Sequence, residues 1–413
     1  MSKISEKTLR NYARLSVVMG ANVQKGQILV VNADIDTMDL TRLVVEEAYK
    51  VGASKVIVNW SDDLINRMHF EHQTVESLTD IPDWMVEQKV SPLRDGAAIL
   101  HIISEVPGIL SGIDAEKISK AMLARSIRFK EASDRTMADK NQWSIVAAPN
   151  TRWAKQVFPE LEEEEAVDKL WEKILYAVQV TEDNDPVEVW KKHNHDLQKR
   201  QDMLNDYNFK SLHFKNRKGT DLTVELVNNH IWSGGSEFSQ DGIEFTPNMP
   251  TEEIFCMPYK YGVNGTVVTT KPLDYNGTII KEFTLTFKEG KVVEYHASNN
   301  EEVLKSLIEF DEGSSFIGEV ALVPYSSPIS LSNLLFYNIL FDENASCHLA
   351  LGRAYPMNVK GGTAMSEEEL EQIGSNNSNT HVDFMFGDNE MTVIGTTHDG
   401  TEVLVLKNGD FVF

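Results

Sequence analysis

The chain has only two cysteines, Cys256 and Cys347, among its 413 residues. Two isolated cysteines make neither a disulfide framework nor a Cys-x-x-Cys zinc motif. No segment approaches the ~18 uninterrupted apolar residues that a membrane-spanning helix needs. The N-terminal sequence MSKISEKTLRNYARL also lacks the apolar stretch of a secretory signal. We therefore expect a cytoplasmic protein that has no membrane partner.

Positive charge is scarce as well, because 39 Lys and Arg residues stand against 63 Asp and Glu residues, for a net charge of -24. An acidic surface repels nucleic acid and anionic membranes and attracts cations, including metal ions and positively charged peptides. We therefore expect no nucleic-acid partner. The hydrophobic content of 41% and the charged content of 25% are those of an ordinary soluble globular protein.

The first half of the chain lacks both the G-x-G-x-x-G and the G-x-x-x-x-G-K-[ST] motif, so nothing indicates a nucleotide site. Short apolar runs alternate there with stretches of helical periodicity, such as Asp39 to Val51. The expected strands are Ile28 to Asn32, Lys55 to Trp60, Ala97 to Ser104 and Ser144 to Ala148. Buried strands separated by helices predict a parallel sheet with helices on its faces.

Two helices should close this half, one over Glu162 to Val180 and one from Asp185 to about Asp206. Asp185 can cap the second helix, and Pro186 suits its first position. Beyond it, Gly-containing turns separate alternating runs, which indicates antiparallel strands. A chain of this length exceeds one ordinary core. We expect an α/β protein with an N-terminal parallel-sheet domain, 1–205, and a C-terminal mixed α+β domain rich in antiparallel strands, 206–413.

His69 and His72 are the first candidate metal ligands along the chain, since they lie three residues apart in the polar stretch RMHFEHQ. No nearby element supplies an obvious third ligand. The sequence therefore favours two surface histidines over a metal pair.

His381 and Asp383 are the second candidate pair, in the alternating segment His-Val-Asp-Phe-Met-Phe-Gly. On a strand the two side chains would share one face, with Val382 and Phe384 on the other. An imidazole and a carboxylate so placed can share a metal site. A half-exposed strand that carries an ion pair explains the pattern equally well.

Two glutamates occupy apolar surroundings. Glu319 opens the run Glu-Val-Ala-Leu-Val, where a carboxylate is unfavourable to bury unless it is paired or bound to metal. Glu253 follows Glu252 before Ile-Phe, and only one of the two can enter a site if the segment is extended. Taken alone, Glu253 is better interpreted as the flank of a strand.

His348 lies in the run Glu343 to Ala350, which we interpret as a helix. Tyr355 would share the face of His348 if that helix continued past Gly352, whereas Glu343, five residues before His348, would lie off it. No H-E-x-x-H motif is present, so the chain is not a zincin. Cys347 is better explained as a small buried side chain than as a nucleophile.

Together these segments resemble the thermophilic aminopeptidase family, which includes aminopeptidase T, aminopeptidase S and PepS. The resemblance runs the full length of the chain. It rests on Pro250-Thr-Glu-Glu-Ile-Phe, Gly318-Glu-Val-Ala-Leu-Val-Pro, the stretches that begin at Asn333 and Leu340, and His381-Val-Asp-Phe-Met.

The resemblance implies a metallo-aminopeptidase with two divalent metal ions (Zn, Co, Mn or Mg) and a homodimer. It implies as metal ligands Glu253, Glu319, Glu343, His348, His381 and Asp383, with Glu319 as the bridge between the ions. Glu343 is the least firmly placed of these. Tyr355 matches a tyrosine beside the metals.

The expected reaction is hydrolysis of the N-terminal residue from short peptides by a metal-activated water. Tyr355 would donate a hydrogen bond to the tetrahedral oxyanion, and Glu319 or Glu343 would carry the proton to the leaving amine. The alternatives are a dimetal amidohydrolase or phosphoesterase, and a non-catalytic peptide-binding protein. The metal, the residue preference and the role of the N-terminal domain beyond dimerisation stay open.

Overall fold

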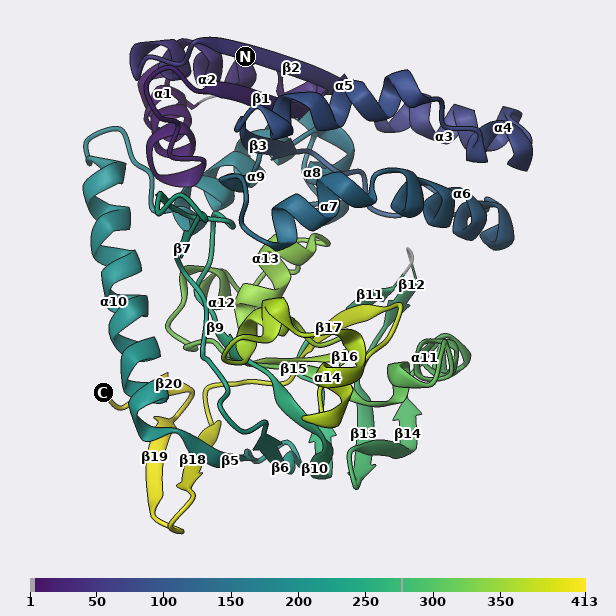
Figure 1. The fold of residues 1–413 in the computed structure, drawn as a ribbon, viewed down its shortest axis with the longest axis vertical. Coiled ribbons are helices and arrows are strands. Elements are labelled where there is room, and N and C mark those ends of the chain that lie inside the picture. Colours follow the sequence, from purple (N-terminus) through teal and green to yellow (C-terminus); the bar gives the residue numbers. More distant parts are fainter. Residues whose placement is uncertain (1–3, 276–277) are drawn as a thin grey trace. The chain divides into compact units, whose positions relative to one another are not determined.

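The computed structural model describes residues 4–275 and 278–413. The chain divides into two compact units. The N-terminal unit contains the residues up to His193 together with Ser236–Pro250, and the C-terminal unit contains Asn194–Gly235 and Thr251–Phe413. The boundary falls within the long helix α10, Pro186–Tyr207 (Figure 1).

The N-terminal unit is built on a parallel four-stranded sheet of order β2-β1-β3-β4, and the first three of these strands are labelled in Figure 1. Its strands are β1 (Ile28–Asp34), β2 (Lys55–Ser61), β3 (Ala98–Ile103) and β4 (Trp143–Ala147). Its helices are α1 (Glu6–Leu15), α2 (Met38–Lys50), α3 (Asp63–His72), α4 (Val75–Thr79), α5 (Asp83–Arg94), α6 (Ala115–Arg128), α7 (Lys130–Met137), α8 (Thr151–Val157) and α9 (Glu163–Ala177), with short turns at Ser16–Gly20 and Ile35–Thr37. The parallel sheet predicted from the apolar runs is confirmed, because buried β-branched and leucine side chains favour central strands.

Tyr12 of α1 hydrogen-bonds to the main chain of the edge strand β4. Its hydroxyl donates to the carbonyl oxygen of Ala147 at 3.0 Å and accepts from the amide of the same residue at 3.1 Å. Since β4 pairs with β3 on only one side, the tyrosine satisfies main-chain groups that a further strand would otherwise pair. The side chain is fully buried.

The segment Ser236–Pro250 belongs to the N-terminal unit although the C-terminal unit surrounds it in sequence. It carries the short hairpin of β7 (Glu237–Phe238) and β8 (Glu244–Phe245). Its main chain hydrogen-bonds to β4, with Ile145 donating to Pro247 and accepting from Met249. The segment is thereby attached to the edge of the parallel sheet.

The C-terminal unit contains an antiparallel eight-stranded sheet of order β14-β13-β10-β6-β5-β18-β19-β20. Its strands are β5 (Phe209–Lys215), β6 (Asp221–Leu226), β10 (Pro258–Val268), β13 (Phe283–Lys288), β14 (Lys291–Ala297), β18 (Thr392–Thr397), β19 (Glu402–Lys407) and β20 (Asp410–Phe411). The short strands β11 (Leu273–Tyr275) and β12 (Thr278–Ile280) pair antiparallel with each other. The antiparallel pairing confirms the prediction from the Gly-containing turns.

A second antiparallel sheet of the same unit has the order β17-β16-β15-β9 (Figure 1). Its strands are β9 (Ile254–Cys256), β15 (Ile317–Leu322), β16 (His348–Gly352) and β17 (His381–Met385). The helices of the unit are α11 (Glu301–Ile308), α12 (Pro328–Ser332), α13 (Ile339–Asp342) and α14 (Glu367–Gln372), with 3-10 turns at Gly313–Ser315, Glu343–Ala345, Pro356–Asn358 and Gly362–Ala364. All the candidate ligands lie on or beside this sheet.

One face of the second sheet is wholly apolar. Its side chains join the main hydrophobic core of the unit, namely Ile254, Cys256, Val320, Leu322, Leu349, Leu351 and Phe384. Because strand side chains alternate between faces, the residues between them must occupy the opposite face. That opposite face carries the polar candidates.

The prediction of a helix over Glu343 to Ala350 is wrong. Only the 3-10 turn Glu343–Ala345 is helical there, Ser346 is extended, and His348 begins strand β16. Leu349 and Leu351 both enter the core because the segment pairs with β15 and β17. Pairing with the neighbouring strands thus determines the secondary structure of a segment whose local pattern suits either a helix or a strand. Among the described helices, none is long and apolar enough to cross a membrane.

Candidate metal centre

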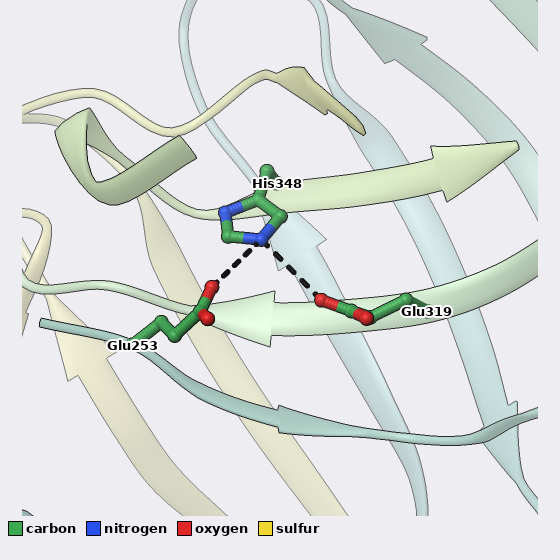
Figure 2. A group of neighbouring side chains, drawn as sticks. All are labelled: Glu253, Glu319 and His348. Carbon is green, nitrogen blue, oxygen red and sulfur yellow. Dashed lines mark ion pairs between the residues drawn. The ribbon is translucent and has the colours of Figure 1, made fainter. Parts of the chain in front are cut away.

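The polar face of the second sheet brings one histidine of β16 close to two glutamates (Figure 2). His348 Nε2 lies 3.1 Å from Glu253 Oε2 and 3.5 Å from Glu319 Oε1. Glu253 directly precedes β9, and Glu319 lies on β15, so three segments far apart in sequence supply the group. All three side chains are buried.

A second group shares one residue with the first. His381 Nε2 lies 3.6 Å from Glu319 Oε2 and 3.5 Å from Asp383 Oδ1. His381 and Asp383 lie on the same face of β17, as their alternation predicts, while Phe384 enters the core. In each group, potential ligand atoms of the three residues lie within 4.8 Å of one another. The two groups meet at Glu319, whose two carboxylate oxygens face different histidines.

Main-chain carbonyl groups orient both imidazole rings. His381 Nδ1 lies 2.7 Å from the carbonyl oxygen of Arg353, and His348 Nδ1 lies 3.2 Å from that of Ser346. Each Nδ1 therefore donates to a carbonyl oxygen, and each Nε2 faces the carboxylates, where it can exchange a proton for a metal ion. This is the arrangement in which a neutral histidine binds a metal ion.

Two carboxylate oxygens of the cluster lack a well-placed hydrogen-bond donor. Glu253 Oε2 and Asp383 Oδ1 are buried and accept no well-aligned hydrogen bond from the described residues, although imidazole nitrogens are nearby. Buried carboxylate oxygens without donors are unfavourable unless a cation compensates them. The residues present therefore fit divalent metal ions.

The pKa values of the acids and imidazoles in the cluster are shifted because these groups lie close together. Burial, together with the charges of Asp383 and Glu253, raises the pKa of Glu319. Burial lowers the pKa of His381, but the charges of Asp383 and Glu319 outweigh it and raise that pKa to about 9. Burial also favours a higher pKa for Asp383, yet the adjacent His381 holds it below its usual value. The carboxylates thus favour a positive charge among them, as a proton on imidazole or as a bound cation.

Glu343 and Tyr355 border the cluster without joining either group. Burial and the carboxylates of Glu253 and Asp383 raise the pKa of Glu343 well above its ordinary value, which places it within electrostatic reach of the ligands. The ring centroids of Tyr355 and His381 are 4.7 Å apart. Burial and the charge of Glu319 raise the pKa of Tyr355, so its phenol stays protonated and can donate a hydrogen bond. Both residues reach the site although the predicted helix does not exist.

The remaining candidates lie elsewhere. His69 and His72 are on α3, where His69 Nδ1 is 3.0 Å from Gln73 Nε2, and neither belongs to a metal group among the described residues. Cys347 is buried, its thiol donates to the carbonyl oxygen of Val323 at 3.5 Å, and burial raises its pKa to about 11. A neutral buried thiol is not a nucleophile, which confirms the structural interpretation of Cys347.

Asn344 is a residue beside the cluster that was not predicted from the sequence. Its buried side-chain oxygen accepts from the amide of Glu252 at 2.7 Å, and its side-chain nitrogen donates to the carbonyl oxygen of Leu340 at 3.1 Å. It thus joins the segment that carries Glu253 to the turn that carries Glu343. No sequence pattern marks such a contact, because its partners are 92 residues apart.

Comparison with known proteins agrees with this geometry. The family described as thermophilic metalloprotease (M29) matches residues 5–411. Aminopeptidase AmpS of Bacillus subtilis is 46% identical over 413 residues, covering 100% of both chains. Aminopeptidase 2 of Geobacillus stearothermophilus is 44% identical over 408 residues, covering 99% of this chain and 98% of the relative.

A solved structure extends the comparison to three dimensions. Wild-type AmpT from Thermus thermophilus is 38% identical, and it superposes with a TM-score of 0.92 over 99% of this chain and 100% of its own. Identity of this level over the full length carries the enzyme class as well as the fold. The chain therefore belongs to the thermophilic metalloprotease (M29) family and is a metallo-aminopeptidase.

Proposed function

We propose that this metallo-aminopeptidase uses two divalent metal ions to release the N-terminal residue of short peptides. The observation that carries the proposal is the pair of overlapping donor groups, Glu253–Glu319–His348 and Glu319–His381–Asp383, which meet at Glu319. One group would hold each ion, and Glu319 would bridge them. Glu319 lies on β15, His348 on β16, and both His381 and Asp383 on β17, so the main-chain hydrogen bonds of one sheet keep the spacing of these ligands.

The donor set limits the choice of metal. It consists of carboxylate oxygens and imidazole nitrogens without thiolate, which suits Zn, Co, Mn or Mg. Bound at this site, such ions would polarise the scissile carbonyl and activate a water molecule.

The chain's own residues supply the remaining chemistry. Tyr355, protonated and beside His381, would donate a hydrogen bond to the oxygen that becomes negative in the tetrahedral transition state. Glu343 borders the ligands without belonging to either group of three, which favours it as the carrier of the proton to the leaving amine. The surplus of carboxylates would attract the α-ammonium group of the substrate and so favour cleavage at a free N-terminus.

The proposal includes the organisation of the chain. Residues 206–413, without the segment Ser236–Pro250 that belongs to the N-terminal unit, would form the catalytic domain, because every candidate ligand lies there, and residues 1–205 would form most of a separate α/β domain. The resemblance to the family further supports a homodimer. Light scattering during size-exclusion chromatography would measure the mass in solution directly.

Chelation tests the central proposal. Protein dialysed against EDTA and then against metal-free buffer should lose release of p-nitroaniline from an aminoacyl anilide, and Zn²⁺, Co²⁺, Mn²⁺ or Mg²⁺ should restore it. An Nα-acetylated substrate should resist cleavage. Full activity after verified metal removal would contradict the metal mechanism. Faster hydrolysis of p-nitrophenyl phosphate would instead favour a phosphoesterase, and peptide binding without turnover would favour a binding protein.

A further inference from the structure

We propose that the N-terminal unit contains a second ligand site, which binds a free α-amino acid as a zwitterion on one face of the parallel sheet. The site is a row of three polar side chains, with an unpaired carboxylate toward one end of the strands and an unpaired ammonium group beside the row. The inference concerns a part of the chain that holds no metal candidate, so it does not depend on the two-metal mechanism.

The polar row crosses the middle of the parallel sheet. Asn32 of β1 is level with Asn59 of β2 on one side and with His101 of β3 on the other. Side chains at one level of neighbouring strands point to the same face, so the three lie side by side. Asn59 Nδ2 donates to Asn32 Oδ1 at 3.0 Å. Parallel strands are normally apolar on both faces, so a row of three polar residues at their centre requires an explanation.

Solvent reaches this row, although β1 and β3 are central strands. Asn32, Asn59 and His101 are each half-buried. The opposite face of the same two central strands is closed, since four of its side chains are at most 1% exposed, namely Leu29, Val31, Leu100 and Ile102. Helices α5 and α7 cover the face of the row only beside Ile99, through an apolar cluster with Val90, Leu93 and Ala132. The space above the row is therefore open to a small ligand.

His101 has hydrogen-bonding capacity that the protein does not use. Within the described ranges, neither ring nitrogen has a hydrogen-bond partner. Burial and the charge of Lys89 on α5 lower the pKa of His101 to about 4, so the imidazole is neutral at neutral pH. A neutral imidazole offers one donor and one acceptor. Together with the amides of the two asparagines, it can bind a ligand that has both kinds of group.

Asp34 supplies negative charge at the carboxyl end of the row. It is the last residue of β1 and lies on the same face as Asn32, two residues or ~6.6 Å further along the strand. Its buried carboxylate accepts from the amide of Asp36 at 2.9 Å, and no cation pairs with it among the described residues. Burial and the charges of Asp36 and Asp63 raise its pKa to about 6. A cation bound beside Asp34 would offset both effects.

Lys89 supplies positive charge beside the row. It lies within electrostatic reach of His101, and its Nζ is 4.9 Å from the centre of the Phe129 ring. Arg125 lies over the same ring, at 5.6 Å. No carboxylate of the described residues forms an ion pair with Lys89. An anionic group of a ligand would therefore find an unpaired cation at this side of the row.

The topology of the sheet places the row where open α/β sheets bind ligands. Strands β2 and β3 lie on opposite sides of β1, so the chain changes direction across the sheet between them. Ligands of such sheets bind outside the carboxyl ends of the strands at this position. The fold alone does not imply a ligand, but here the polar row and Asp34 lie at the same place.

The charges around the row identify the class of ligand. A phosphate group would be repelled by Asp34, and a metal ion would be repelled by Lys89. A zwitterion suits both residues, with its ammonium group toward Asp34 and its carboxylate toward Lys89. The reaction of a metallo-aminopeptidase releases free α-amino acids, which carry both groups. The row would then donate to the carboxylate and accept from the ammonium group.

A binding experiment on the metal-free, full-length chain tests the proposal. The standard L-amino acids are screened by saturation-transfer-difference NMR, and the strongest binder is titrated calorimetrically. Its Nα-acetyl derivative lacks the ammonium group, and its amide lacks the carboxylate. We expect each derivative to bind at least ~10-fold more weakly than the amino acid, because each loses one charged hydrogen-bonding partner.

Two variants assign the charges to their residues. Asp34→Asn keeps an acceptor for the amide of Asp36, and it should no longer distinguish the amino acid from its Nα-acetyl derivative. Lys89→Gln, at an exposed position, should no longer distinguish the amino acid from its amide. Each variant should bind the amino acid about 10-fold more weakly than the wild type. The matched controls Asp39→Asn and Lys55→Gln, both exposed in the same unit, should bind as the wild type does.

A further variant separates this site from the metal centre. Glu319→Gln should keep the binding of the amino acid, because the ligand lies in the other unit. Binding that is lost in Glu319→Gln and kept in Asp34→Asn and Lys89→Gln would place the amino acid at the metal centre and refute the proposal. Absence of binding to every amino acid would also refute it. If Asp34→Asn does not fold, as judged by circular dichroism, the result for Lys89→Gln decides.

Discussion

Oε1 of Glu319 lies 3.5 Å from Nε2 of His348, so a buried carboxylate of β15 meets an imidazole of β16 on the polar face of one sheet. Its other oxygen, Oε2, faces His381 at 3.6 Å. No other residue of the cluster belongs to both ligand groups found among the described residues. This shared position makes Glu319 the most informative residue to change.

Glu319→Gln should weaken metal binding more than any other single ligand change. The amide keeps the size of the side chain but removes the negative charge from both ligand groups, so we expect a loss of affinity of about 100-fold or more and a comparable loss of kcat/KM. Metal content after dialysis and anilide hydrolysis measure the two effects. Glu312→Gln, at an exposed glutamate, is the matched control. Retention of two ions by the Glu319 variant would exclude Glu319 as a bridge.

Tyr355→Phe should impair turnover without removing metal. The variant keeps the ring that contacts His381 and Phe255 and loses only the hydroxyl group. Loss of one hydrogen-bond donor to an oxyanion lowers kcat by about 10²–10³-fold, with KM and metal content close to those of the wild type. Tyr261→Phe, at a tyrosine that is 52% exposed, controls for the substitution itself. A kcat within a factor of about three of the wild-type value would show that the phenol takes no part in catalysis.

Tyr12→Phe should destabilise the N-terminal unit. The variant leaves both the amide and the carbonyl group of Ala147 without their shared hydroxyl partner in a buried setting. Unsatisfied buried polar groups cost about 1–3 kcal/mol in the free energy of unfolding. Urea unfolding followed by circular dichroism measures the loss. Tyr49→Phe, at a tyrosine that is 52% exposed, should change stability little, and equal effects at both positions would argue against the Tyr12 contact.

Glu237 and Asp139 should make the stability of the N-terminal unit depend on pH. Burial and the neighbouring carboxylate of Asp139 raise the pKa of Glu237 from 4.5 to about 8. Between these values the folded chain retains a proton that the unfolded chain releases. The stabilisation is therefore complete below about pH 4.5 and is lost as the pH rises through about 8.

Glu237→Gln tests this pH dependence, because the amide imitates the protonated acid at every pH. The unfolding midpoint of the variant should exceed that of the wild type increasingly between about pH 5 and about pH 9. The exposed Glu160→Gln should show no such trend. A difference between variant and wild type that stays constant over this range would mean that Glu237 titrates normally.

Much of the fold could be predicted from local patterns. Apolar runs such as Ile28 to Asn32 predict buried parallel strands, and the alternation around His381 predicts a strand with both ligands on one face. Side-chain alternation along a strand is a property of the backbone, so neighbouring residues alone determine it. The sequence also singles out Glu319, because an acid in an apolar run requires compensation by a partner or a metal ion.

The run from Glu343 to Gly352 is a segment whose secondary structure could not be predicted from local patterns. By itself it suits a helix, yet pairing with β15 and β17 makes His348 the start of a strand. A short apolar segment has no strong preference of its own, so its partners decide its structure. On a helix, Glu343 would lie off the face that carries His348. Because His348 lies on strand β16 instead, that argument against Glu343 as a site residue no longer applies.

The sequence by itself determined that His381 and Asp383 share one face of a strand and which strands would bury their apolar faces, because alternation is local, whereas the full set of ligands came from the family resemblance. Only the tertiary structure decided that Glu319 is shared by two ligand groups and that Asn32 lies level with His101 in the parallel sheet. Those relations depend on the register between strands that are distant in sequence. Register is set by the packing of the whole core, and no single segment encodes it.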